Sequence, residues 1–142
     1  MKSSQNTLII SDNIQLVEEL KRLLQELEVK HIQVAKSGKE AICKFFDQMP
    51  AFTFLDMNSE SIQTSALAKV IERSEATKLT LIYRSMSLAE ELLTESDRVC
   101  VIKKPITITK LNDIINPDLS FANLLEEARM LVSQESDSQE WQ

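Results

Sequence analysis

Short runs of apolar residues alternate along the chain with longer segments in which apolar residues recur every three or four positions. The runs are rich in Val, Ile, Leu and Phe, and nearly every position in them is apolar, which is typical of strands buried on both faces of a parallel sheet. Most of the runs end in polar residues, as expected where a strand gives way to a turn. The predicted strands are Thr7–Ile10, His31–Ala35, Phe52–Leu55, Leu79–Tyr83 and Val99–Ile102.

The segments between these runs have the periodicity of amphipathic helices. In the first segment Ile14, Val17 and Leu20 fall on one face, with charged residues between them. Pro50 and Pro117 stop two of the later segments, because proline cannot continue a helix. Alternation of strands and helices predicts an α/β fold, a doubly wound five-stranded parallel sheet with right-handed crossovers. The predicted helices are Ile14–Leu27, Ala41–Met49, Ile62–Ile71, Leu88–Thr94 and Ile108–Ile115.

The pattern predicts one globular domain over residues 5–116 and an added segment over residues 117–142. That segment contains a further apolar stripe at helical spacing and ends in the acidic sequence SQESDSQEWQ. It therefore predicts an extra C-terminal helix followed by a frayed tail. An apolar helix face needs a partner in water, and we expect a homodimer through residues 119–132. Packing within the chain and contact with an output partner are the alternatives. The stripe consists of Phe121, Leu124, Leu125, Ala128, Leu131 and Val132.

Composition removes several classes of function. The 142 residues include 16 basic and 22 acidic ones, a net charge of −6, which argues against direct nucleic-acid binding. No apolar stretch is long enough for a membrane span, so we expect a soluble, cytoplasmic protein with no membrane partner. Two cysteines and one histidine cannot supply a zinc site, and the single glycine, Gly38, excludes Gly-rich nucleotide-binding loops.

The residues with chemical potential collect where the predicted strands end. Ser11 and Asp12 follow the first strand, Asp56 follows the third, Tyr83 ends the fourth and Lys104 follows the fifth. Ligands of open α/β sheets bind at the carboxyl ends of the strands, so two carboxylates and a lysine are expected to converge at one edge. Each acid alone has a plainer interpretation, because strand-terminal Asp is also common as a turn former or helix cap.

Together these residues resemble the receiver domain of two-component response regulators over about residues 6–116. The resemblance rests on Asp12 after the first strand, the segment PAFTFLDMNSE around Asp56, and KKP at the end of the fifth strand. It implies the flavodoxin-like strand order 2-1-3-4-5. It also implies that Asp56 accepts a phosphoryl group from a histidine kinase or phosphotransfer protein, and that a downstream protein partner reads the result.

The resemblance further implies a role for each residue of the site. Asp12, Asp56 and the backbone carbonyl of Asn58 would hold Mg²⁺, with waters completing the octahedron. Lys104 would pair with Asp56 and then with the phosphoryl group, and Pro105 would follow a cis peptide bond. We expect no enzymatic activity beyond self-catalysed phosphotransfer.

Three positions depart from the pattern of the family. Ser11 stands where a second acid is usual, so we expect weak Mg²⁺ binding. Tyr83 replaces a Thr or Ser, and Val101 replaces an aromatic residue, so both switch positions are altered.

Two hypotheses follow: a phosphorylated signalling receiver, stand-alone or N-terminal, or a degenerate receiver that serves as a phosphorylation-independent docking module. A flavin-binding flavodoxin-like protein is a third, weaker hypothesis, because the first loop offers few phosphate-binding groups.

Overall fold

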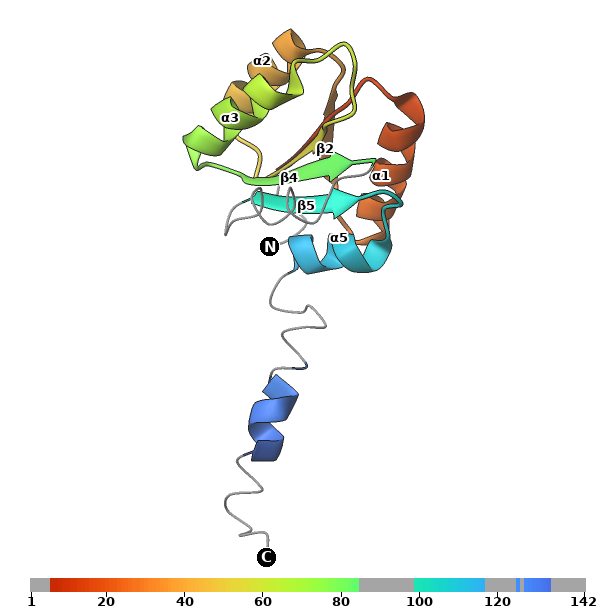
Figure 1. Ribbon diagram of the computed structural model, residues 1–142, viewed down its shortest axis with the longest axis vertical. Coiled ribbons are helices and arrows are strands. Elements are labelled where there is room, and N and C mark those ends of the chain that lie inside the picture. The colour runs from red at the N-terminus through yellow and green to blue at the C-terminus, as the bar shows by residue number, and fades with distance from the viewer. Residues whose placement is uncertain (1–5, 85–98, 117–124, 126, 134–142) are drawn as a thin grey trace, which may run out of the picture. The chain divides into compact units, whose positions relative to one another are not determined.

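The computed structural model describes residues 6–84, 99–116, 125 and 127–133 (Figure 1). Strands and helices alternate along these residues as the sequence predicts. The predicted helix Leu88–Thr94 lies outside the described residues. The elements are β1 (Asn6–Ile10), α1 (Ile14–Glu26), β2 (His31–Ala35), α2 (Gly38–Gln48), β3 (Phe52–Asp56), α3 (Thr64–Ser74), β4 (Lys78–Tyr83), β5 (Val99–Lys103) and α5 (Ile108–Ile115).

The five described strands form one parallel sheet in the order β2-β1-β3-β4-β5, which confirms the predicted doubly wound fold. β1 pairs with β2 on one side and with β3 on the other, so strand order reverses between β1 and β3. Ile10 lies opposite Leu55, and Asp56 lies opposite Ile82 on β4. The residues that follow β1 therefore lie beside the end of β3, at the switch point where open α/β sheets bind ligands.

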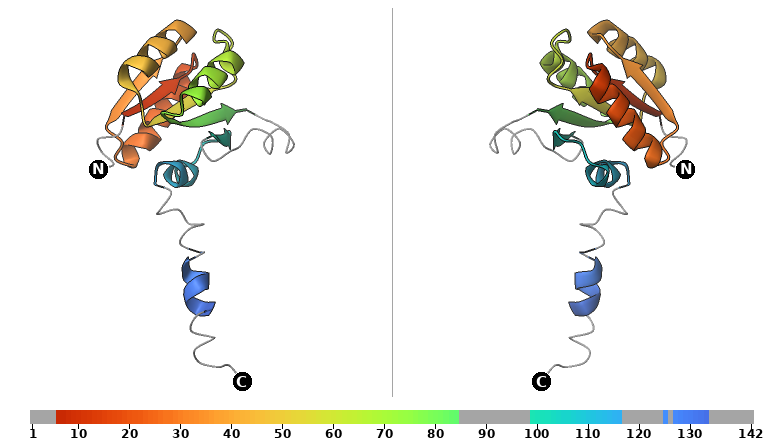
Figure 2. Two further views of the ribbon diagram at one scale, coloured as in Figure 1. Left: turned by 90° about the vertical axis from the view of Figure 1, so that its left-hand side faces the viewer. Right: turned by 90° about the vertical axis from the view of Figure 1, so that its right-hand side faces the viewer.

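Helices cover both faces of the sheet. Figure 2 shows α2 and α3 on one face and α1 on the other. Under α2 and α3, Phe45, Leu67 and Ile71 pack against strand residues that include Leu55 in one buried cluster. The opposite face of β3 carries the fully buried Phe54, because successive side chains of a strand alternate between faces. The apolar stripe of α1 is buried at Val17 and Leu20, as its spacing predicts, but the first predicted member, Ile14, is exposed at the start of the helix. The buried residues of α1 are Leu16, Val17, Leu20, Leu23 and Leu24.

Side-chain caps begin two of the helices and shape the loops at the strand ends. The Asn13 side chain accepts hydrogen bonds from the backbone N–H groups of Gln15 and Leu16, so Asn13 caps the N-terminus of α1. At α2, the Ser37 hydroxyl accepts from the Glu40 N–H, and the Glu40 carboxylate accepts from the Lys36 N–H. This reciprocal arrangement is a capping box shifted by one position.

The chain divides into two compact units between Ile108 and Thr109. In the second unit, α5 buries Leu111, Ile114 and Ile115. Residues 125 and 127–133 are helical, which agrees with the predicted C-terminal helix. Its described apolar side chains are exposed, and the homodimer through residues 119–132 stays a prediction. Among the described residues, no helix has both the length and the apolar character needed to cross a bilayer.

Candidate functional site

A pocket of about 510 Å³ opens at the carboxyl ends of the strands, over the switch point. It brings together all four residues that the family resemblance assigned to the site: Asp12, Asp56, Asn58 and Lys104. They come from three different strand ends, so only the folded sheet assembles them. The complete lining is Asp12, Asn13, Ile14, Gln15, Asp56, Asn58, Glu60, Arg84 and Lys104.

Asp56 is the last residue of β3, and only 2% of its surface is exposed. Its Oδ2 atom accepts a hydrogen bond of 2.8 Å from the Ser11 hydroxyl. Its Oδ1 atom accepts one of 3.0 Å from the Asn58 N–H, and the Lys104 Nζ atom lies 3.9 Å away. A carboxylate this deeply buried is stable only when such donors compensate for lost hydration. The protein thus holds Asp56 in one orientation.

Ser11 lies directly beside Asp56 and is completely buried. While its hydroxyl donates to Asp56, its oxygen accepts a hydrogen bond of 3.0 Å from the Asn13 N–H. The position where a second acid is usual in receiver domains therefore carries a neutral donor. This substitution removes one negative charge next to Asp56 and replaces repulsion between two carboxylates by a hydrogen bond.

Asp12 is exposed at the edge of the pocket and is held by the loop that follows β3. Its Oδ2 atom accepts hydrogen bonds from the Ser61 N–H at 3.0 Å and from the Ser61 hydroxyl at 2.7 Å. These bonds hold the pKa of the Asp12 carboxyl below its usual value, and the bond from the Ser61 hydroxyl has the larger effect. The Asp12 N–H donates to the Ser59 hydroxyl at 3.3 Å. Sequence reasoning did not single out Ser59 or Ser61, because serines in a polar loop carry no signal that separates them from ordinary turn residues.

The end of β4 presents Arg84 to the pocket, whereas Tyr83 packs against the hydrophobic core. Strand alternation explains this, because Tyr83 continues the face of Leu79 and Leu81. Extending that alternation by one residue could have pointed to Arg84. The Arg84 N–H donates to the Asn58 side-chain oxygen and so links the loops that follow β3 and β4.

β5 ends in the lysine of the site. The Lys104 N–H donates to the Tyr83 carbonyl at 2.8 Å, which extends the pairing of β4 and β5 by one residue. The Lys104–Pro105 peptide bond is cis, as the resemblance implied. Val101, the altered aromatic position, is half-buried on β5 opposite Leu81.

The donor set of the pocket fits a hard divalent cation. Mg²⁺ is usually bound by one or two carboxylates and several waters, with oxygen ligands throughout. Asp12 and Asp56 supply two carboxylates, and the Asn58 carbonyl lies on the same loop. Within the described part of the chain, no group of three or more His, Cys, Asp or Glu side chains gathers as a metal cluster. These oxygen donors are of the kind that Mg²⁺ takes in proteins, and weak Mg²⁺ binding stays a prediction.

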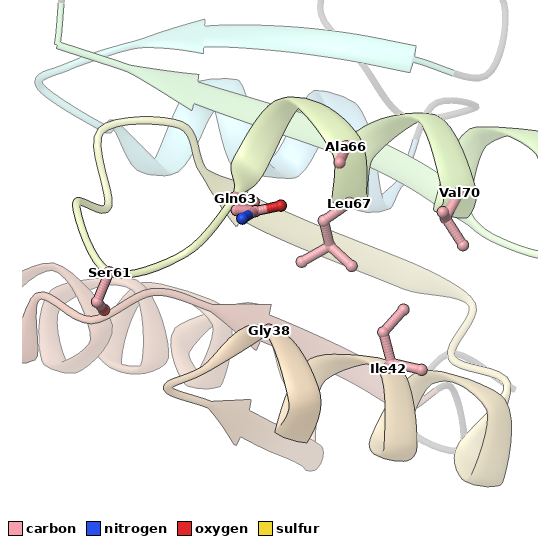
Figure 3. A pocket seen from close by; sticks show the side chains of 7 residues that line it. All are labelled: Gly38, Ile42, Ser61, Gln63, Ala66, Leu67 and Val70. Atoms are coloured by element: carbon pink, nitrogen blue, oxygen red, sulfur yellow. The ribbon is translucent and has the colours of Figure 1, made fainter.

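A second cavity, of about 310 Å³, lies between α2 and α3 (Figure 3). Its walls are mainly apolar, and Figure 3 shows Ile42 of α2 and Leu67 of α3 pointing toward one another across it. Ser61 stands at one end of this groove, in the loop that also holds Asp12. The lining is Gly38, Ile42, Ser61, Gln63, Ala66, Leu67 and Val70.

Comparison with solved structures places this fold among response regulator receiver domains. A two-component response regulator from Cytophaga hutchinsonii is 24% identical, with a TM-score of 0.67 over 80% of this chain and 96% of that one. A CheY-like receiver domain from Methylobacillus flagellatus is 22% identical, with a TM-score of 0.65 over 80% and 97% of the two chains. The chemotaxis response regulator CheY4 of Vibrio cholerae is 16% identical, with a TM-score of 0.67 over 81% and 98%. The chain thus has the receiver fold.

Neither a protein-family model nor a curated protein sequence matches the chain.

Proposed function

We propose that the protein is a signalling receiver that accepts a phosphoryl group on Asp56 from a histidine kinase or phosphotransfer protein. One observation carries the proposal: a buried carboxylate at the end of a central strand, oriented by Ser11 and Asn58, faces a pocket that also holds Lys104. A carboxylate kept only to end a strand would not need a lysine from two strands away. The receiver fold supports the same function.

In the proposed transfer, a carboxylate oxygen of Asp56 forms a bond to phosphorus while the bond between phosphorus and the donor histidine nitrogen breaks. The electron pair of the broken bond stays on that nitrogen. The histidine ring leaves as a neutral imidazole when its other nitrogen carries a proton. Little covalent help is needed, but the phosphoryl oxygens must be held close to carboxylates that repel them. Catalysis of this kind therefore depends on neutralising charge and on positioning.

Lys104 supplies part of that neutralisation. Its ammonium group lies 3.9 Å from Oδ1 of Asp56, close enough to shift onto an incoming phosphoryl oxygen. Arg84 lines the same pocket and adds a second positive charge. Mg²⁺, when bound, would screen the carboxylates and the phosphoryl oxygens from one another. Ser11 lowers the need for such screening, because it places a neutral donor where receivers usually have an acid.

The alternative is a phosphorylation-independent docking module acting through the same surfaces. It is favoured by the packing of the partly buried Tyr83 against the core, because a phenol held there is not placed to move to a phosphoryl oxygen as a Thr hydroxyl would. The two functions differ in one respect that can be measured. A phosphoacceptor gains the mass of a phosphoryl group when it is incubated with a phosphodonor, whereas a docking module keeps its mass. In either case a cytoplasmic location and a downstream protein partner are part of the proposal.

The test is incubation with Mg²⁺ and a small acyl phosphate donor, followed by intact mass spectrometry. The wild-type chain is expected to gain one phosphoryl group, and Asp56→Asn is expected to gain none. Asp47→Asn, on the exposed surface of α2, is the matched control and should behave like the wild type. Equal labelling of Asp56→Asn and wild type would refute the assignment, and an unlabelled wild type would favour the docking module.

A further inference from the structure

The loop after β3 contacts Asp12 and Asp56, two of the three acids that line the pocket. Asp56 ends that strand, and two residues later the Asn58 N–H bonds back to its carboxylate. The same loop then reaches across to Asp12, which lies 49 positions before Ser61 in the sequence. Ser59 contacts the backbone of Asp12, and Ser61 contacts its carboxylate. One short segment therefore sets the spacing between the two acids.

The contacts of Ser61 are concentrated on a single oxygen atom. Its N–H and its hydroxyl both donate to Oδ2 of Asp12, at 3.0 and 2.7 Å. Two donors from one residue fix the rotation of a carboxylate better than one donor does, because both angles of the side chain are then defined. Asp12 is exposed, so packing alone does not fix its rotamer, and these bonds limit the rotamers open to it.

Ser61 lies outside the pocket that Asp12 lines. It lines the apolar groove between α2 and α3 instead, where Figure 3 shows it at one end. Ser61 would therefore not touch a cation in the pocket, and any effect of it on cation binding would pass through Asp12. Hydrogen bonds of this kind commonly orient the carboxylates that bind metals.

We propose that Ser61 is a positioning residue for the cation site: by holding Oδ2 of Asp12, it keeps the other carboxylate oxygen available to a divalent cation in the pocket. The inference rests on the proposed function, because it assumes that the pocket takes Mg²⁺. With Ser11 in place of a second acid, Asp12 is the only carboxylate that the loop after β1 contributes to the pocket. Cation binding therefore depends on the orientation of Asp12 more than it would if the loop after β1 contributed two acids.

The test is a Mg²⁺ titration of isotope-labelled protein followed by NMR, with the amide signals of Asn13 and Asn58 as reporters. Ser61→Ala is expected to raise the dissociation constant for Mg²⁺ about tenfold, the lower end of the effect seen when an orienting contact is removed. Ser61→Thr retains the hydroxyl and should stay within about threefold of the wild type. Ser65→Ala, the same chemical change on the exposed side of α3, is the control and should bind as the wild type does.

The outcomes separate this inference from the proposed function. Wild-type binding together with equal or tighter binding by Ser61→Ala would overturn the role of Ser61, and tighter binding would show that Ser61 competes with the cation. A wild-type protein without any saturable Mg²⁺ response would instead remove the cation site, and the inference with it. The spectrum of each free protein shows whether it is folded, so a loss of structure is not mistaken for a loss of binding.

Discussion

Replacing Ser11 by alanine should destabilise the protein by about 2 kcal/mol at neutral pH. The hydroxyl of Ser11 is the donor described for Oδ2 of Asp56, and both residues are almost fully buried. A hydrogen bond to a charged group contributes about 1.5–3 kcal/mol, and water cannot easily replace the lost donor at a buried site. The Asn13 N–H also loses an acceptor, but it lies at the exposed start of α1 and can bond to water.

Urea unfolding followed by far-ultraviolet circular dichroism measures this cost. With a slope of about 2 kcal/mol/M, the expected loss moves the midpoint down by about 1 M urea. Ser65→Ala, at an exposed position of α3, is the control and should stay within about 0.5 kcal/mol of the wild type.

A double-mutant cycle with Asp56→Asn tests the cause. An amide at position 56 is neutral, so Ser11→Ala should cost only about 1 kcal/mol in that background. The difference, about 1 kcal/mol, is the part that comes from the charge of Asp56. If Ser11→Ala costs the same with and without that charge, or is as harmless as Ser65→Ala, the hydrogen bond does not stabilise the buried carboxylate and the reasoning is wrong.

Three further predictions follow from other parts of the molecule. Thr80→Val should raise the free energy of unfolding, measured by urea unfolding, by about 1 kcal/mol, because the buried Thr80 hydroxyl has no described hydrogen-bond partner. A loss of stability would show that it has one. The N–H of Lys36 holds the pKa of Glu40 below its usual value, so this stabilisation is present above the ordinary carboxyl pKa and disappears as pH falls through the lowered one. The thermal midpoint of Glu40→Gln should therefore fall below that of the wild type at neutral pH and converge with it in acid; a constant difference would contradict this. In sedimentation equilibrium, the full chain should associate through residues 119–132 while a truncation ending at Asn116 stays monomeric; two monomers at high micromolar concentration would count against the dimer.

The sequence predicted the sheet and the pocket because both depend on short-range regularities. Apolar runs between amphipathic segments indicate parallel strands under helices, and the carboxyl ends of such strands meet at one edge. Those regularities are enough to place Asp12, Asp56 and Lys104 at the same end of the sheet. Strand boundaries shifted by one residue where a strand continued into its turn, as β3 does by including Asp56. The helix boundaries shifted further, and α2 begins three residues before its predicted start.

The parts that the sequence did not predict depend on contacts between loops. Ser61 meets Asp12 only because β1 and β3 are neighbours and their loops leave the sheet side by side. The sequence marked Ser11 as a missing acid, and only the structure shows that its hydroxyl donates directly to Asp56. The sequence pointed to Tyr83 at the end of the fourth strand, whereas it is Arg84 that lines the pocket. Side-chain hydrogen bonds at a sheet edge follow from three-dimensional register, which periodicity does not reveal.

The most direct test of the phosphoacceptor is to locate the modification on the chain. After incubation with Mg²⁺ and a small acyl phosphate donor, borohydride reduces an aspartyl phosphate to homoserine, and peptide mass spectrometry then finds the altered residue. The account predicts homoserine at position 56 and an unchanged aspartate at position 12, because only Asp56 combines a buried, oriented carboxylate with Lys104. Homoserine at position 12, phosphate on a serine beside the pocket such as Ser11 or Ser61, or no modification at all would contradict it.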